Sequence, residues 1–515
     1  MASMYHSTRS TEAQCTAKRA VLNGIAPDGG LYVTDSLGEH SFSPEELTGL
    51  TYAETAQRIL SALLDDYTPE EMAECVQAAY GSTFDSDEVA PVVAVGSDFV
   101  LELFHGPTSA FKDVALQMLP QLMGRAALST DERIMILAAT SGDTGKAALA
   151  GFADVPNLGI TVFYPHGGTS EIQRLQMVTQ SGENVAVCAV RGNFDDTQST
   201  VKRIFADSEI KETLAESGIV LSSANSINIG RLAPQVVYYF TAYAQLRRMG
   251  AIQEGDSVDF CVPTGNFGDV LAGYFAYRMG LPVNRFIVAS NRNNILTDFL
   301  TSGVYDRNRP FYKTASPSMD ILISSNLERL LYYMACDAHR SGEDLDGAKD
   351  PCDYVATLMV SLAKDGRYQV CDSVLRRIQA LFACGWANDD QAKDAIRSSY
   401  RDHGYLMDTH TAVAWHVSKS IPLDGAAARI VLSTASPYKF ADEVLDALHP
   451  ADALVDTTPS CADDFACMKR VEAETGAAIP RPLAELEGRA VRFTDVIDAE
   501  EMPAYVLAAC KEILA

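Results

Sequence analysis

The stretch SVDFCVPTGNFGD, residues 257–269, decides the fold class of this chain. It predicts a buried strand over 257–262, then a glycine loop, then a helix that begins near Asp269. The same alternation recurs along the chain, with further strands expected at 99–104, 133–138, 159–164, 185–190, 281–290 and 429–433. Strands that alternate with helices in this way are typical of α/β proteins with mainly parallel sheets. In such sheets, ligands bind in the loops at the carboxyl ends of the strands.

The length of 515 residues predicts more than one domain. We expect a mainly helical N-terminal region over 1–95 and two open α/β domains with parallel-rich sheets. The large one would be formed by 96–128 and 245–515, and the small one, inserted in it, by 129–244.

Two prolines bear on the helices that we expect. Pro120 should kink or end the helix that starts near Phe111, because proline lacks the N–H that the helix ladder needs. A long helix should follow Pro234. Residues 325–415 should be mostly helical.

Composition limits the classes of partner. Lys and Arg number 41 and Asp and Glu 68, which gives a net charge of −27 and argues against nucleic acid or an anionic membrane as the main partner. We see no secretory signal and no apolar stretch near the ~18–20 residues of a membrane span, and expect a soluble, cytoplasmic protein. The eleven cysteines include no CxxC, and the closest pair is Cys461 and Cys467. We therefore expect reduced thiols, with neither a disulfide framework nor a metal site.

The loop over 105–113, HGPTSAFKD, carries the first candidate residue. Lys112 lies just inside a predicted helix start, where the helix dipole and partial burial would favour the uncharged amine. An uncharged amine can form a Schiff base with a carbonyl compound. The alternative is an ordinary lysine on the surface.

A second loop, ATSGDTGK over 139–146, offers backbone N–H groups to an anion at a helix start. It differs from a nucleotide-binding P-loop, which needs Gly in place of Thr140 and Ser or Thr in place of Ala147. An ordinary capped turn is the alternative.

Three more loops have a composition suited to ligands. In 222–231, SSANSINIGR, Arg231 could bind a phosphate through two N–H groups, or the loop could be a polar turn. In 263–269, Gly265 and Gly268 allow the backbone to approach a phosphate, although a plain glycine turn is equally consistent and the dinucleotide pattern GxGxxG is incomplete. In 433–439, STASPYK, a hydroxyl could contact a heterocyclic nitrogen or simply cap a helix.

Together these loops resemble those of threonine synthases, which are fold-type II enzymes that use pyridoxal phosphate (PLP). The resemblance extends over nearly the whole chain, through residues 5–9, 26–32, 102–113, 140–145, 223–231, 263–269, 316–320, 325–329 and 433–440. It implies a fold like that of the tryptophan synthase β subunit. It also implies the cofactor pyridoxal 5'-phosphate.

The resemblance assigns a role to each loop. Lys112 would bind PLP covalently, and Thr434 would face its pyridine nitrogen. The cofactor phosphate would be bound by Gly265, Asn266, Phe267, Gly268 and Asp269. The substrate carboxylate would be bound by Ser141, Gly142, Asp143 and Thr144. The substrate phosphate would be bound by Asn225, Ser226 and Arg231.

The implied activity is that of a carbon–oxygen lyase acting on phosphates, in the last step of threonine biosynthesis. O-phosphohomoserine and water would give threonine and phosphate through γ-elimination and β-addition of water, in a monomeric protein. A phospho-lyase that releases 2-oxobutyrate from the same substrate would share these residues. A non-catalytic regulatory relative would be expected to lose Lys112 or the glycine loop, and both are present.

Two positions depart from the patterns of relatives. Many fold-type II enzymes have Asn where this chain has Asp143, although threonine synthases of this long type resemble it there. Thr409 stands where the family usually has Pro, which affects the local turn rather than the chemistry.

Overall fold

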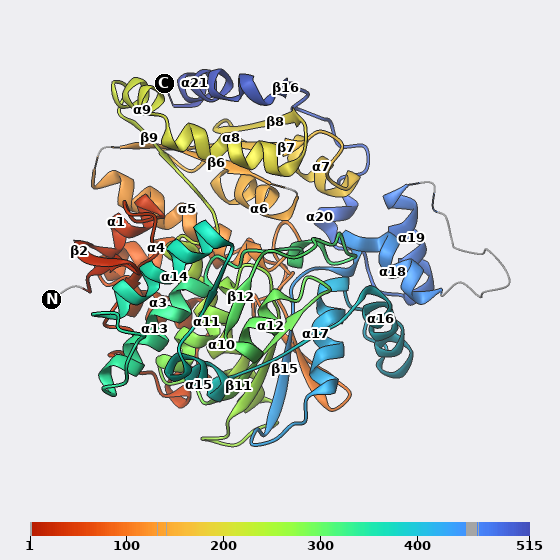
Figure 1. The fold of residues 1–515 in the computed structure, drawn as a ribbon. Helices are drawn as coiled ribbons and strands as arrows, with labels where there is room; N and C mark the ends of the chain where they lie inside the picture. Colours follow the sequence, from red (N-terminus) through yellow and green to blue (C-terminus); the bar gives the residue numbers. More distant parts are fainter. Residues whose placement is uncertain (1–2, 131, 141, 450–460, 462, 515) are drawn as a thin grey trace.

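The computed structural model describes residues 3–514 apart from 131, 141, 450–460 and 462, and contains two large sheets (Figure 1). The six-stranded sheet has the order β14-β11-β10-β15-β5-β4, with only β4 antiparallel to its neighbour. Its strands are β4 Val92–Val95, β5 Asp98–Glu102, β10 Val258–Pro263, β11 Val283–Ser290, β14 Phe382–Trp386 and β15 Ala428–Ser433. The predicted α/β architecture with parallel-rich sheets is confirmed.

The second sheet is parallel throughout, in the order β16-β8-β7-β6-β9. Its strands are β6 Arg133–Ala139, β7 Leu158–Pro165, β8 Val185–Arg191, β9 Ile219–Ser222 and β16 Val496–Asp498. Strands β7 and β8 are buried almost throughout, as expected for strands covered on both faces.

Helices cover both sheets. The helices that follow β5 to β11 along the chain are α5 Lys112–Leu128, α6 Asp143–Phe152, α7 Glu171–Val178, α8 Phe194–Ala206, α9 Ser208–Ala215, α10 Ile229–Arg248, α11 Gly268–Arg278 and α12 Ile295–Ser302. The later ones are α13 Leu327–Arg340, α14 Pro351–Asp365, α15 Asp372–Leu381, α16 Asp389–His403, α17 Thr409–Ser420, α18 Ala441–Leu448, α19 Asp464–Thr475, α20 Arg481–Ala484 and α21 Met502–Ile513. The short strands β12 Val304–Asp306 and β13 Arg367–Gln369 pair with each other. Residues 325–415 are thus mostly helical as predicted, although β14 was missed.

The N-terminal region combines helices with a small sheet. Its helices are α1 Ala17–Asn23, α2 Pro44–Thr48, α3 Tyr52–Leu63 and α4 Pro69–Tyr80. The antiparallel strands β1 Tyr5–Ser7, β2 Ser10–Cys15 and β3 Tyr32–Thr34 lie beside them. Both α3 and α4 begin with a capping box, which satisfies backbone N–H groups at the helix start.

The end of the chain lies with the five-stranded sheet, although the expected large domain included it. Strand β16 pairs with β8, and α21 packs against β7, α8 and α9 (Figure 1). Without β16, the apolar strand β8 would form an open sheet edge. The domain limits stay predictions, but the residues that complete the second sheet come from the far end of the chain.

The two prolines lie inside helices. Helix α10 starts at Ile229, earlier than expected, and includes Pro234 near its beginning. Helix α5 continues past Pro120, so of the two predicted outcomes, a kink or an end of the helix, the end is wrong. Pro120 leaves the carbonyl of Leu116 without its usual donor, and α6 packs there with Gly151: a Cβ added at that glycine would lie 1.8 Å from the Leu116 oxygen. Helix α6 therefore packs closely on α5 at the carbonyl that Pro120 leaves without a donor.

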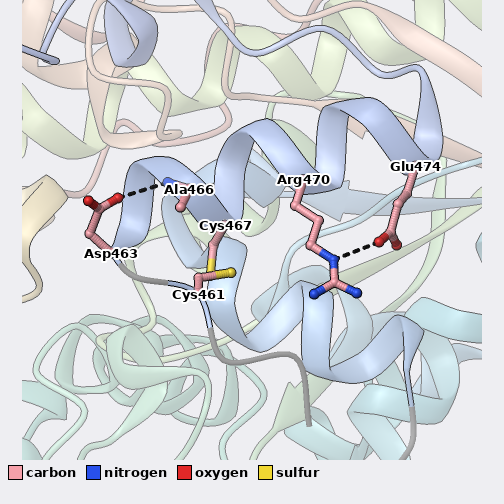
Figure 2. The surroundings of a disulfide bond; sticks show 6 residues. All are labelled: Cys461, Asp463, Ala466, Cys467, Arg470 and Glu474. Carbon is pink, nitrogen blue, oxygen red and sulfur yellow. Dashed lines mark hydrogen bonds and ion pairs between the residues drawn. A yellow bond between two sulfur atoms is a disulfide. The ribbon is translucent and has the colours of Figure 1, made fainter. Parts of the chain in front are cut away.

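One disulfide bond contradicts the expectation of reduced thiols. Cys461 is bonded to Cys467, which lies in the first turn of α19 (Figure 2). Asp463 caps this helix by accepting from the N–H of Ala466 at 2.8 Å, so the chain turns back and brings Cys461 next to Cys467. The other nine cysteines are free. The described residues include no helix that is both long and apolar enough to cross a bilayer.

The close contact of α5 and α6 gives a first prediction. Gly151→Ala should lower the free energy of unfolding by about 1–3 kcal/mol, because the added methyl overlaps the Leu116 carbonyl. Gly124→Ala is the matched control: its Cβ would lie 3.4 Å from the nearest atom, and alanine favours a helix by about 1 kcal/mol. Chemical denaturation of both variants is the measurement. Equal or higher stability of Gly151→Ala would contradict the contact.

Candidate active site

The loops after β5, β10 and β15 lie next to one another, because these parallel strands are neighbours in the six-stranded sheet. Lys112 begins α5 at the end of the first loop, and its side chain is buried. Its Nζ lies 3.5 Å from Oδ2 of Asp143 and 3.5 Å from Oγ of Ser318. Burial lowers the pKa of Lys112, and the positive charges of Lys439 and Arg231 lower it further, against the opposing effect of Asp143. The alternative of a lysine on the surface is wrong.

Hydrogen bonds within the loop before Lys112 and to the Thr434 loop define its conformation. Asp113 accepts from the backbone N–H of Thr108 at 2.8 Å and from its hydroxyl at 2.6 Å. Ser109 has a φ of 57°, an uncommon conformation for a residue with a side chain. The N–H of Phe111 donates to the carbonyl of Thr434 at 2.8 Å, so Thr434 lies in a loop directly bonded to the Lys112 loop.

The glycine loop ends at an uncapped helix. Phe267 has a φ of 62° and precedes α11, and no side chain among the described residues caps this helix start. The carbonyls of the loop are engaged elsewhere: Gly265 accepts from the hydroxyl of Ser324 at 2.7 Å, and Asn266 accepts from both the backbone and the side-chain amide of Asn326 at 3.1 Å. The free N–H groups of the helix start remain for an anion.

The space around the glycine loop fits a phosphate. A Cβ at Gly268 would meet only the amide nitrogens of Asn326 at 3.4 Å and Gln235 at 4.0 Å. The start of α11 therefore has two side-chain amides near it and is not crowded at Gly268. Gly265 differs, because a Cβ there would lie 2.5 Å from the carbonyl oxygen of Ser318. Gly265 is required by packing, and Gly268 leaves room for a ligand.

Asp269 follows the loop as a buried carboxyl group. The hydroxyls of Tyr238 and Tyr239 donate to its Oδ1 at 2.5 and 2.9 Å. Burial raises its pKa to about 6, although both hydroxyls favour the charged form. Its Oδ2 has no hydrogen-bond partner among the described residues.

Arg231 lies in the first turn of α10 and is only 5% exposed. Its Nη1 donates to the carbonyl of Ala224 at 2.9 Å, and no carboxylate of the described residues forms an ion pair with it. Burial lowers its pKa to about 10. Asn225 is exposed, and the carbonyl of Ser226 accepts from Asn326 at 3.1 Å. The guanidinium therefore has a backbone acceptor but no anionic partner among the described residues.

The loop after β6 is ordered by Thr140, whose hydroxyl accepts from the N–H groups of Gly142 and Gly145 at 3.0 Å. Asp143 begins α6 and is buried, and Thr144 is half-buried. The predicted residue Ser141 lies outside the described residues.

Four residues that contact Lys112, Asp143 or the glycine loop were not among the site residues predicted from the sequence. Lys439 is fully buried, and its Nζ lies 2.8 Å from Oδ1 of Asp143. Gln173 donates to the same oxygen at 3.0 Å. Ser318 and Asn326 complete the set. The one available signal was the position of Lys439 among the apolar residues of PYKFA, where a lysine needs a buried partner.

Comparison with known proteins agrees with this geometry. Residues 99–432 match the family model of pyridoxal-phosphate dependent enzymes, so the chain is a member of that class. Residues 4–80 match the model "Threonine synthase N terminus" and 411–506 match "Threonine synthase, C-terminal". The chain belongs to the threonine synthase family.

Several relatives have close similarity to the chain. The threonine synthase of Pseudomonas aeruginosa is 40% identical over 85% of this chain and 89% of its own length. The crystal structure of yeast threonine synthase is 33% identical, with a TM-score of 0.86 over 99% of this chain and 98% of the yeast chain. A PLP-bound threonine synthase from Brucella melitensis is 36% identical, with a TM-score of 0.84 over 99% of both chains. Human threonine synthase-like 1 is 40% identical over 83% of this chain, which spans only 57% of the human protein.

Asn326 holds the glycine loop and the Arg231 loop together, and this gives a second prediction. Asn326→Ala removes the donor to Ser226 and Asn266 and the acceptor for Arg329, whose Nη1 lies 2.6 Å from Oδ1. The free energy of unfolding should fall by about 1–3 kcal/mol, because buried polar groups lose their partners. The neighbouring variant Ser325→Ala is the control. Equal denaturation midpoints for the two variants would show that the bridge does not stabilise the protein.

Proposed function

We propose that this protein is a threonine synthase that converts O-phosphohomoserine and water into threonine and phosphate. The observation that carries the proposal is the buried Arg231, which has no carboxylate partner among the described residues and whose positive charge lowers the pKa of Lys112. The glycine loop before α11 is a separate anion site. A buried lysine together with two candidate phosphate sites suits a phosphorylated cofactor and a phosphorylated substrate.

In this proposal, Lys112 binds PLP covalently, residues 265–269 bind its phosphate, and Thr434 contacts its ring nitrogen. PLP supplies the electron sink for the reaction. A neutral hydroxyl at Thr434 does not keep the ring nitrogen protonated as a carboxylate would, which favours a less electron-poor ring. The amine of Lys112 would move protons at Cα and Cβ of the substrate.

The substrate is held at its two charged ends. The N–H groups at the start of α6, with residues 141–144, bind the carboxylate. Arg231, with Asn225 and Ser226, binds the phosphate and stabilises its charge as it leaves Cγ.

Product analysis tests the activity. Purified protein with PLP and O-phosphohomoserine should release phosphate and threonine in equal amounts. Phosphate with 2-oxobutyrate would instead identify a phospho-lyase. A protein that releases no phosphate while it binds PLP would be a regulatory relative.

The third prediction concerns the lysine that binds PLP. Lys112→Ala should abolish the covalent adduct that borohydride traps, as measured by mass spectrometry of peptides. Lys146→Met is the control, because Lys146 is a second buried lysine whose pKa is lowered by burial to about 7. It should keep the adduct at Lys112. An adduct at Lys146 or Lys439 in the wild-type protein would overturn the assignment.

The fourth prediction concerns Arg231. Arg231→Lys should lower kcat/KM for O-phosphohomoserine about ten- to 150-fold, or roughly 1.5–3 kcal/mol, because an ammonium cannot replace a two-pronged contact to phosphate. The visible absorption of bound PLP should not change, since the glycine loop is separate. Arg248→Lys, at the exposed end of the same helix, is the control. Loss of PLP with normal kinetics in the remaining holoenzyme would place Arg231 in the cofactor site instead.

A further inference from the structure

One buried carboxylate lies between two buried lysines. Oδ1 of Asp143 accepts from Nζ of Lys439 at 2.8 Å and from Gln173 at 3.0 Å. Oδ2 of the same residue lies 3.5 Å from Nζ of Lys112. The side chains are 0% exposed for Lys439, 4% for Asp143 and 10% for Lys112. Water therefore contributes little to the balance of charge among these three groups.

The two lysines differ in how closely they approach Asp143. Lys439 makes a close ion pair with Asp143 and also donates to the carbonyl of Thr108 at 2.9 Å. Among the described residues, Lys112 has two polar contacts, both at 3.5 Å and so at the outer limit of a hydrogen bond, and its Nζ lies 4.8 Å from the centre of the Phe111 ring. A buried ammonium is stabilised by a close counter-ion and by full hydrogen bonding. The protein thus favours the charged form of Lys439 over that of Lys112.

The charge on Asp143 depends on this arrangement. Burial alone would raise the pKa of Asp143, but the positive charges of Lys439 and then Lys112 hold it well below its usual range. If Lys439 were absent, the ionised Asp143 would have Lys112 as its single cationic neighbour within 4 Å among the described residues. Lys112 would then be stabilised as an ammonium, which cannot attack a carbonyl.

We propose that Lys439 is a positioning residue, which occupies the carboxylate of Asp143 so that Lys112 remains available as an uncharged amine toward the PLP aldehyde. This inference rests on the proposed role of Lys112. Lys439 comes from the turn Pro437–Phe440 after β15 and reaches both the start of α6 and the loop before α5. It therefore also fixes the distance between these two elements.

Other charged groups act on the same three residues. Arg231 lowers the pKa of Lys112 further. Burial raises the pKa of Asp113, although Thr108 and Lys439 oppose this rise. Lys439 and Arg489 both lower the pKa of Lys146, after burial as the main cause. None of these groups approaches Asp143 as closely as Lys439 does, so the effect of Lys439 should be separable by mutation.

The test is a double-mutant cycle of Lys439→Met and Asp143→Asn in the full-length apoprotein. The measurement is the rate of covalent PLP capture against pH, followed by stopped-flow absorbance and checked by borohydride trapping at Lys112. This readout requires an uncharged Lys112 but no substrate. It therefore stays valid if the protein acts on a substrate other than O-phosphohomoserine, and product analysis decides that question separately.

Lys439→Met should slow capture about tenfold or more at pH 7 and shift the rising limb of the pH profile by about one unit or more to higher pH. Asp143→Asn should show no such shift to higher pH, because the counter-ion is gone. The double variant should regain a wild-type pH profile, because neither the carboxylate nor the second ammonium remains.

A purely structural role for Lys439 gives a different result. Lys439→Met would then slow capture equally at every pH, and the double variant would be no faster than the single one; either result overturns the proposal. Lys439→Arg retains the charge and should keep the wild-type pH profile, and it serves as the test if Lys439→Met does not fold. An alkaline shift in folded Lys439→Arg would also overturn the proposal. Lys146→Met controls for the loss of a buried lysine charge near the site.

Discussion

The pairing of buried cations with Asp143 is the constraint on which the site depends. Lys112, Lys439 and Arg231 are all buried, and Asp143 is the carboxylate that contacts the two lysines. Lys439 approaches this carboxylate to 2.8 Å, and Arg231 has no carboxylate partner among the described residues. A buried cation without a partner is costly, and an anionic ligand removes that cost on binding. Arg231 therefore favours an anionic ligand even though the chain as a whole carries a net charge of −27.

The loops that surround this charge are held in place by the N-terminal region. Arg329 is fully buried and donates to the carbonyls of Tyr32 and Ile227, at 2.9 and 2.6 Å, and to Asn326. Its neighbour Glu328 accepts from Thr8 and Arg9. These bonds connect β3 and the start of the chain to the Arg231 loop and, through Asn326, to the glycine loop.

What could be predicted from the sequence was mostly local. The strand, glycine loop and helix of 257–269 were identified because their signals lie within thirteen residues. The partners of Lys439 could not be predicted, since three elements distant in the sequence meet at this lysine. The continuation of α5 past Pro120 could not be predicted for a similar reason, because α6, a separate element, packs on the carbonyl that the proline leaves free. Strand β16 and the Cys461–Cys467 bond likewise depend on how the last part of the chain folds back.

Lys439 and Arg231 illustrate two different uses of a buried cation. Lys439 has an acidic partner and a backbone carbonyl, so its charge is balanced before any ligand binds. Arg231 has one backbone carbonyl and no carboxylate among the described residues. A charge that is already balanced shapes the site, whereas an unbalanced one gains free energy from a ligand. Lys439 is thus balanced within the protein, whereas under the proposed function the charge of Arg231 is left for the phosphate of the substrate.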